Sequence, residues 1–162
     1  MIYEVAGDIL LTGAQALAHG VAPDDPFTCG LAQAIRRRWP ALYSAFLAYR
    51  RGHEPAPGEL WAWTSGDGHT IINLFTQDPS PPRGKRPGRS SLRYLALCLG
   101  GLREYAEAEE LRSLALPRIA TGAGGLDWEL ARPVLDEQLG PLGIPVILYD
   151  VYRPELRATE PL

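Results

Sequence analysis

The stretch Ser113–Trp128, SLALPRIATGAGGLDW, decides how this sequence folds. It opens with a short apolar run that is typical of a buried β-strand. A glycine-rich segment follows over Thr121–Gly125, and Asp127 stands where it can cap a helix that begins at Trp128. Successive backbone N–H groups in such a loop can bind an anion. The loop is not a P-loop, because no Gly-Lys-Ser/Thr follows, and it lacks the G-x-G-x-x-G of a Rossmann fingerprint. A purely structural loop is the alternative.

Strand and helix patterns alternate on either side of this stretch. The predicted strands are Ile2–Val5, Ala14–His19, Glu59–Ser65, His69–Phe75, Ser113–Leu116 and Pro145–Val151, the third and fourth forming a hairpin through Gly66-Asp67-Gly68. Helices are predicted over Gly30–Arg38, over Pro40–Gly52, from a Ser90 cap to about Glu109, and from Trp128 to about Leu139. Fully apolar strands separated by helices predict an α/β fold whose sheet is covered on both faces.

The chain reads as one domain, because it shows neither an internal repeat nor a linker. We expect this domain to span residues 1–152, and we expect the polar tail 153–162, which carries two prolines, to fray. Loops are predicted over Val21–Cys29 and over Gln77–Gly88, the most irregular part of the chain. An apolar fraction of 46% is enough for one ordinary core.

Composition narrows the class of protein. The net charge of -3 argues against a protein that coats nucleic acid by bulk electrostatics, although arginines gather locally at Arg36–Arg38 and at Arg83–Arg89. No apolar run approaches the roughly 20 residues of a membrane span, and no signal peptide is visible. Two cysteines are too few for a disulfide framework, and no zinc spacing occurs. We therefore expect a cytoplasmic protein without a membrane partner. The single lysine among 16 basic residues is typical of a G+C-rich genome, and we expect a bacterial source.

Three candidate binding elements follow strands, where the ligand crevice of a layered α/β protein forms. Asp8, after the first strand, can accept hydrogen bonds from an exocyclic amine or simply cap a turn. Phe27-Thr28-Cys29-Gly30 leads into a helix whose free N–H groups favour an anion, or Thr28 is an ordinary cap. The third element is the glycine-rich loop. Two anion-binding loops in one crevice suit a diphosphate.

With these elements in place, the sequence resembles the macro domain family over about residues 1–151. The matching pieces, in family order, are VAGDI (5–9), ALAHGV (16–21), CGLAQAI with RRRWP (29–40), IINLFTQ (71–77) and LPRIATGAGGLDW (116–128). The last piece is the most specific. The AHG and NLFTQ stretches resemble the branch that includes terminal ADP-ribose protein glycohydrolase, the antitoxin macro domains that remove ADP-ribose from DNA, and the yeast ADP-ribose-1″-phosphate phosphatase.

The resemblance implies a three-layer α/β macro domain with a central mixed sheet of about six strands and helices on both faces. It also implies binding of ADP-ribose or of an ADP-ribosylated macromolecule, nucleic acid included, by a monomer that needs no cofactor and no metal. Asp8 would hold the adenine amine, and Val151 or Tyr152 would wall the adenine. The implied ligand-binding residues are Asp8, Ile9, Thr28, Cys29, Gly30, Leu31, Pro117, Ile119, Thr121, Gly122, Ala123, Gly124, Gly125, Leu126, Val151 and Tyr152.

The chain departs from this branch at its catalytic positions. The glycohydrolases carry a lysine just after the strand that matches IINLFTQ, where this chain has Gln77 or Asp78, and the human-type enzyme has an aspartate where this chain has Gly124. The remaining catalytic candidates are His19, which can act as an acid or base near pH 7, Lys85, which can act as a nucleophile, and Asp78 as a third candidate. For each, a purely structural or solvated role is the alternative. Cys29, at a helix start, is a weaker nucleophile candidate.

Three functions from different classes remain. The first is a hydrolase that acts on an ADP-ribosyl adduct of protein or nucleic acid, or on ADP-ribose-1″-phosphate. The second is a reader module that binds ADP-ribose without chemistry, which the missing lysine and aspartate favour. The third is an antitoxin-like, DNA-facing module in which the Arg83–Arg89 loop holds phosphates. We favour binding first and hydrolysis second.

Overall fold

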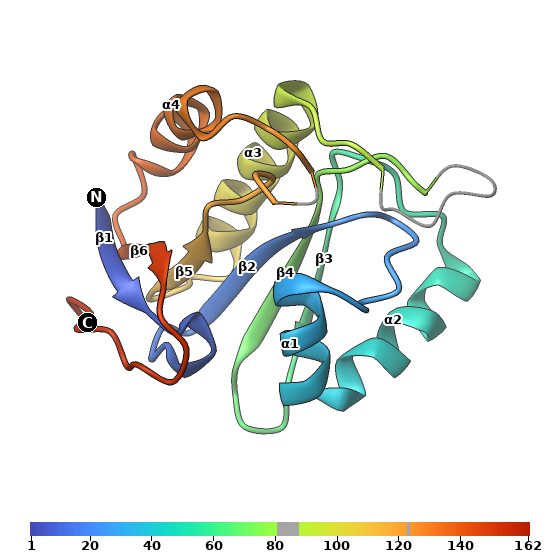
Figure 1. Ribbon diagram of the computed structural model, residues 1–162, viewed down its shortest axis with the longest axis horizontal. Helices are drawn as coiled ribbons and strands as arrows, with labels where there is room; N and C mark the ends of the chain where they lie inside the picture. Colours follow the sequence, from blue (N-terminus) through green and yellow to red (C-terminus); the bar gives the residue numbers. More distant parts are fainter. Residues whose placement is uncertain (81–87, 123) are drawn as a thin grey trace.

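The computed structural model describes residues 1–80, 88–122 and 124–162 (Figure 1). Within these residues six strands form one mixed sheet in the order β1-β6-β5-β2-β4-β3, with β3 antiparallel at its edge and the other pairs parallel. The strands are β1 (Ile2–Gly7), β2 (Ala16–Val21), β3 (Leu60–Thr64), β4 (Thr70–Phe75), β5 (Leu114–Pro117) and β6 (Val146–Tyr152).

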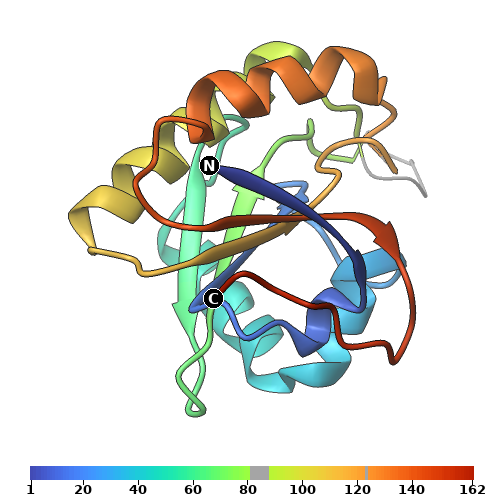
Figure 2. The ribbon, with the colours of Figure 1, turned by 90° about the vertical axis from the view of Figure 1, so that its left-hand side faces the viewer.

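Helices cover both faces of this sheet, as Figures 1 and 2 show. One face carries α1 (Gly30–Arg38) and α2 (Pro40–Gly52), and the other carries α3 (Leu92–Ala108) and α4 (Trp128–Leu139). Because side chains alternate along a strand, β2 sends Leu17 into the core under α1 and α2 and Ala18 into the core under α3 and α4. A short 3-10 helix, η1 (Ile9–Leu11), follows β1. The predicted three-layer α/β fold is confirmed.

Several predicted boundaries differ from the structure by one or two residues, and two of these differences have a physical explanation. The helix cap is Ser91, whose side chain accepts from the N–H of Tyr94, and not Ser90, which pairs with Gln77 in an isolated β-bridge. The strand expected to stop before Gly20 runs on to Val21, because β2 lies between β4 and β5 in the middle of the sheet. A glycine suits this place, since a Cβ there would lie 2.6 Å from the hydroxyl of Thr76.

The tail 153–162 does not fray but packs beside η1, which corrects the prediction (Figure 2). The carboxylate of Glu160 accepts hydrogen bonds from the side chain of Thr12, from the N–H of Gly13 at 2.7 Å and from the hydroxyl of Tyr149 at 2.9 Å. The N–H of Asp8 donates to the carbonyl of Leu156 at 2.7 Å. These bonds fix the tail against the carboxyl ends of β1 and β6. Within the described ranges, no helix is both long and apolar enough to span a membrane.

Candidate functional site

A continuous cleft lies at the carboxyl ends of the parallel strands. Its first chamber, about 410 Å³, is lined by Ile9, Gly30, Leu31, Gln33, Ala34, Pro117, Tyr149 and Tyr152. Its second chamber, about 360 Å³, is lined by Asp25, Cys29, Gly30, Leu31, Ala32, Pro117, Arg118, Thr121, Gly122, Tyr149, Asp150 and Tyr152. Five residues belong to both chambers, so the two form one elongated binding site that is open to an extended ligand.

The start of α1 forms one wall of this cleft. Gly30 adopts the left-handed conformation, with φ of 60°, which favours glycine, and a Cβ there would meet nothing within 4 Å. Cys29 is the N-cap residue, but its side chain makes no capping hydrogen bond, and the first turn holds no acidic residue. The first N–H groups of a helix have no partner within the helix. This wall therefore presents donors and a positive dipole end to the cleft.

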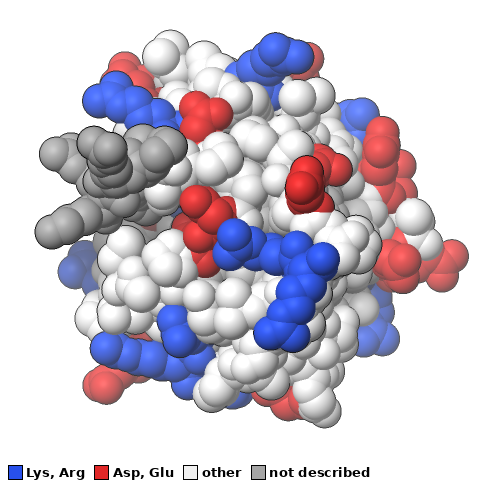
Figure 3. All heavy atoms as spheres, turned by 90° about the vertical axis from the view of Figure 1, so that its right-hand side faces the viewer, with Lys and Arg blue, Asp and Glu red and all other residues white. Residues whose placement is uncertain are grey.

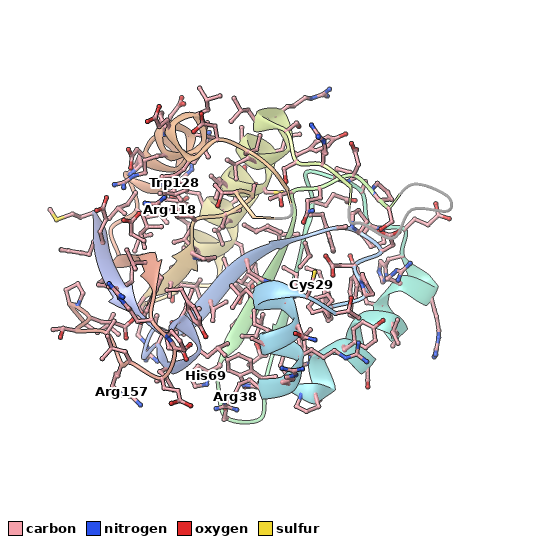
Figure 4. All side chains as sticks on the ribbon, in the orientation of Figure 1. Cys29, Arg38, His69, Arg118, Trp128 and Arg157 are labelled. Carbon is pink, nitrogen blue, oxygen red and sulfur yellow. The ribbon has the colours of Figure 1, made fainter. Side chains whose placement is uncertain are left out.

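The segment after β5 forms the opposite wall, and its Arg118 lines the second chamber together with Cys29, both labelled in Figure 4. The segment is folded on itself: the hydroxyl of Thr121 donates to the carbonyl of Arg118 at 2.8 Å, and the N–H of Leu126 donates to the carbonyl of Ala120 at 2.9 Å. Its outer side is fixed by the N–H of Ser90, which donates to the carbonyl of Gly124 at 3.0 Å. The loop is therefore shaped before any ligand binds.

Arg118 is the cation of the second chamber. Its Nε donates to a carboxylate oxygen of Asp150 at 2.8 Å, and its guanidinium lies 5.4 Å from the ring centroid of Trp128. Both side chains of the pair are partly exposed, so the pair contributes little to stability. It does hold a guanidinium at the edge of the cleft, where the remaining N–H groups of Arg118 can meet an anion.

Asp8 is buried and oriented by two backbone groups. One carboxylate oxygen accepts from the N–H of Leu10 at 3.0 Å and caps η1, and the other accepts from the N–H of Glu155 at 3.0 Å. Asp8 does not line either chamber, but the next residue, Ile9, lines the first. Each carboxylate oxygen has a second lone pair, so this arrangement leaves acceptor capacity for an amine beside Ile9.

Asp25 is a buried carboxylate of the second chamber that the sequence analysis did not single out. Its two oxygens accept from the N–H groups of Phe27 at 2.8 Å and of Ala22 at 3.1 Å. Burial raises the pKa of Asp25 above its usual value, the two N–H donors oppose that shift, and the neighbouring charge of Asp24 adds to it. The carboxyl group is therefore held rigidly and takes up a proton more readily than a solvated aspartate.

Two of the predicted catalytic residues, His19 and Asp78, lie away from the chamber walls. His19 is buried in β2, its Nε2 lies 2.7 Å from the Oδ1 of Asn73 on β4, and burial lowers its pKa to about 4. It is a neutral side chain within the fold at pH 7, and it lines neither chamber. The carboxylate of Asp78 accepts from the hydroxyl of Tyr94 at 2.8 Å and lines neither chamber. Lys85 lies outside the described residues.

Several predicted ligand-binding residues are brought together, and others are not. Those that line the cleft are Ile9, Cys29, Gly30, Leu31, Pro117, Thr121, Gly122 and Tyr152. Those that lie off its walls are Asp8, Thr28, Ile119, Gly124, Gly125, Leu126 and Val151, and Ala123 is outside the described residues. Lining residues missed by the sequence analysis are Asp25, Ala32, Gln33, Ala34, Arg118, Tyr149 and Asp150.

Helical spacing would have revealed two of the missed residues. Gln33 and Ala34 lie three and four residues after Gly30, the predicted helix start, and residues at these spacings share a face of a helix. Asp25 and Tyr149 carried no signal of this kind, because long-range packing brings them to the cleft. Among the described residues, no three His, Cys, Asp or Glu side chains gather where they could hold a metal ion.

Comparisons with known proteins point to one group. No family model matches the chain. A DNA ADP-ribosyl glycohydrolase of Mycobacterium tuberculosis is 31% identical over 132 residues, which cover 80% of this chain and 36% of that protein. The macrodomain of Mycobacterium tuberculosis DarG superposes with a TM-score of 0.79 at 28% identity and covers 96% of this chain and 99% of its own.

A third similar protein contains a ligand. The structure of Thermosipho africanus DarTG in complex with ADP-ribose superposes with a TM-score of 0.78 at 23% identity, over 96% of this chain and 42% of that one. This chain spans between 36% and 45% of the length of the curated relatives that it matches. The likeness therefore concerns one domain of those longer proteins.

Proposed function

This chain belongs to the macro domain family, and on that premise we propose that it binds ADP-ribose in the cleft and removes ADP-ribosyl groups from DNA. One observation carries the proposal: the donor-bearing start of α1 and the segment Pro117–Gly122 line the same continuous cleft. Two such walls suit a diphosphate, because each presents backbone N–H groups to an anion. The similarity to DNA ADP-ribosyl glycohydrolases supports the reaction.

We propose that the parts of ADP-ribose follow one another along the cleft. The adenosine half lies in the first chamber, where Ile9 and Tyr152 supply apolar and aromatic surface and Asp8 accepts the adenine amine. The diphosphate lies between Gly30 and Thr121. The distal ribose then enters the second chamber beside Asp25 and Cys29. In this arrangement Asp8, Gly30 and Thr121 have the roles that the sequence predicts, and Asp25 gains a role beside the distal ribose.

The hydrolytic step breaks the bond between the anomeric carbon of the distal ribose and a base nitrogen. A water oxygen bonds to that carbon, one water proton passes to a base, and the departing nitrogen takes up a proton. The carboxylates that line the second chamber are Asp25 and Asp150, and Asp150 is paired with Arg118. We therefore propose Asp25 as the group that accepts the water proton. A role for Lys85 stays a prediction.

A reader module is the second candidate function. The position after β4, where glycohydrolases of the resembled branch carry a lysine, holds Gln77 or Asp78, and the side-chain amide of Gln77 donates to the carbonyl of Gly88 at 2.8 Å. Gln77 is buried, and the single lysine of the chain, Lys85, lies outside the described residues. An ADP-ribose binder without turnover is consistent with these observations.

Two measurements test these functions in order. Calorimetric titration of the purified chain with ADP-ribose tests binding, and no heat at millimolar ligand would rule out both functions. Incubation with an ADP-ribosylated DNA oligonucleotide then tests turnover, with released ADP-ribose and unmodified oligonucleotide as products. Binding without release identifies a reader. Release by the wild type and loss of release in Asp25→Asn, with ADP-ribose still bound, supports the assignment of Asp25. The monomeric state and the cytoplasmic location stay predictions.

A further inference from the structure

A separate cavity between α1 and α2 carries a second ligand site. This cavity, about 380 Å³ and here called the arginine groove, is lined by Phe27, Thr28, Gln33, Arg36, Arg37, Pro40, Tyr43 and Ser44. Every polar side chain in its lining can donate a hydrogen bond, and none is acidic. A lining of hydroxyls, one amide and two guanidinium groups is typical of a site for an anion.

Arg36 is held in place before any ligand arrives. Its Nη1 donates to the carbonyl of Pro26 at 2.9 Å, and its guanidinium carbon lies 3.8 Å from the ring centroid of Tyr43. Neither contact neutralises the charge, and further N–H groups of the guanidinium remain available to an acceptor. A planar cation fixed on an aromatic ring needs little reordering when it binds a phosphate oxygen.

The three arginines of α1 have different surroundings. Arg38 forms an ion pair with Asp67 at 3.2 Å, whereas Arg36 and Arg37 take part in none of the ion pairs within the described ranges. Arg37 is exposed. On the side that carries α2, acidic and basic groups are interspersed, so no broad field of one sign covers this face (Figure 3). The arginine groove is thus a local cationic site.

The arginine groove adjoins the cleft of the proposed function. Thr28 lines the groove and the next residue, Cys29, lines the second chamber, while Gln33 lines both the groove and the first chamber. Consecutive Cα atoms are only about 3.8 Å apart, so the turn Phe27–Gly30 is a narrow ridge between the two. A nucleic acid strand that leaves the second chamber can cross this ridge. Every nucleotide of a DNA strand carries a backbone phosphate, so the phosphates next to the modified nucleotide can reach the groove.

We propose that the arginine groove binds the phosphodiester backbone of the single-stranded DNA that carries the ADP-ribosyl group. This inference rests on the proposed function, because it places the modified nucleotide at the second chamber. Single-stranded DNA is the form that fits, because in a duplex the modified base must leave the stack before its bond to the ADP-ribosyl group can reach a pocket. Arg36 and Arg37 bind one or two phosphates, and Thr28 and Ser44 add neutral donors. Specificity for a base sequence does not follow, because phosphate contacts position a strand without reading it.

The test compares two substrates of the same chemistry and different length. One is an ADP-ribosylated oligonucleotide of about ten nucleotides, and the other is the ADP-ribosylated nucleoside. We expect wild-type kcat/KM to be at least tenfold higher for the oligonucleotide, and Arg37→Glu to remove that preference while the nucleoside rate stays unchanged. Arg51→Glu is the matched control, because Arg51 is an exposed arginine of α2 outside the groove. If the wild type binds without turnover, fluorescence anisotropy of the same two ligands replaces the rates.

Salt supplies a second readout. Two neutralised phosphates on a single strand predict a slope of log affinity against log salt that is steeper by roughly 1.4 for the oligonucleotide, and Arg37→Glu flattens it. Equal wild-type values for the two substrates, or equal losses in Arg37→Glu and Arg51→Glu, overturn the inference. A wild type that fails to bind ADP-ribose overturns the proposed function instead, so the two failures are distinguishable.

Discussion

Gly124→Ala tests whether the loop after β5 is shaped as tightly as the structure shows. A Cβ at this position would lie within 3.0 Å of the side-chain hydroxyl of Ser90 and 2.8 Å from the carbonyl oxygen of Ala120. That carbonyl accepts from the N–H of Leu126 at 2.9 Å, and the carbonyl of Gly124 accepts from the N–H of Ser90 at 3.0 Å. The loop cannot move away without weakening these bonds. Overpacking of this kind typically costs about 1–3 kcal/mol of the free energy of unfolding.

Urea unfolding and calorimetric titration with ADP-ribose measure the two consequences. We expect Gly124→Ala to lower the free energy of unfolding by about 1–3 kcal/mol. We also expect it to weaken the affinity for ADP-ribose at least tenfold, which corresponds to about 1.4 kcal/mol of binding free energy. Gly122→Ala is the control for stability, because it lies in the same loop, lacks a positive φ and its added Cβ would meet nothing within 4 Å. We expect its free energy of unfolding to stay within about 0.5 kcal/mol of the wild type.

The Ser90 hydroxyl makes the prediction more specific. This buried hydroxyl has no hydrogen-bond partner among the described residues, so Ser90→Ala removes no bond that they show and leaves stability nearly unchanged. In the double variant, the smaller side chain at 90 relieves part of the clash, and the two effects are not additive. Wild-type stability and affinity in Gly124→Ala would refute the reasoning, and so would strictly additive effects in the double variant.

Three further predictions concern other parts of the fold. In Asp25→Asn, a side-chain NH2 group replaces one carboxylate oxygen, so one of the two backbone N–H groups loses its acceptor. We expect urea unfolding to show a loss of about 1–3 kcal/mol in the free energy of unfolding. An unchanged midpoint would contradict the hydrogen bonds to Phe27 and Ala22. Glu160→Gln weakens the acceptor for Thr12, Gly13 and Tyr149, so it should lower the melting temperature, whereas Glu104→Gln, on the exposed side of α3, should not. Because the pKa of His19 is lowered to about 4 in the folded chain, this histidine takes up a proton at a higher pH in the unfolded chain than in the folded chain. Stability that is fully present above pH 6.5 is therefore lost as the pH falls toward 4, by about 1.4 kcal/mol per pH unit for this group, and His19→Gln should lack that slope.

Local signals in the sequence were sufficient for most of the fold. Gly66-Asp67-Gly68 predicted the hairpin of β3 and β4, and Pro40 and Gly52 mark the ends of α2 in the structure as predicted. Asp127 caps α4 as expected, with its side chain accepting from the N–H of Glu129 at 2.9 Å. These signals succeed because turn, cap and periodicity depend on residues close in sequence.

The tail and the far side of the cleft depend on contacts between distant residues. Nothing near Glu160 in the sequence shows that Thr12, Gly13 and Tyr149 will surround it, so a polar segment with two prolines reads as frayed. Asp25 was hidden for the same reason, since its loop gives no sign of facing Thr121 across the cleft. Periodicity shows which side of an element is buried, and it does not show which loops meet.

The carboxyl end of α1, opposite the anion site, is hydrogen-bonded to the β3–β4 turn. The Oδ2 of Asp67 in the β3–β4 turn accepts from Arg38 at 3.2 Å and from the indole N–H of Trp39 at 3.4 Å, and Figure 4 shows Arg38 and His69 together beneath α1. Hydrogen bonds from Ser65 and His69 lower the pKa of Asp67, so it stays ionised at neutral and mildly acidic pH. A hairpin at the amino ends of the strands thus anchors the carboxyl end of the helix whose first turn faces the cleft. Because a helix is rigid over this length, a change at Asp67 should alter the aim of the N–H groups at Gly30 without touching the ligand.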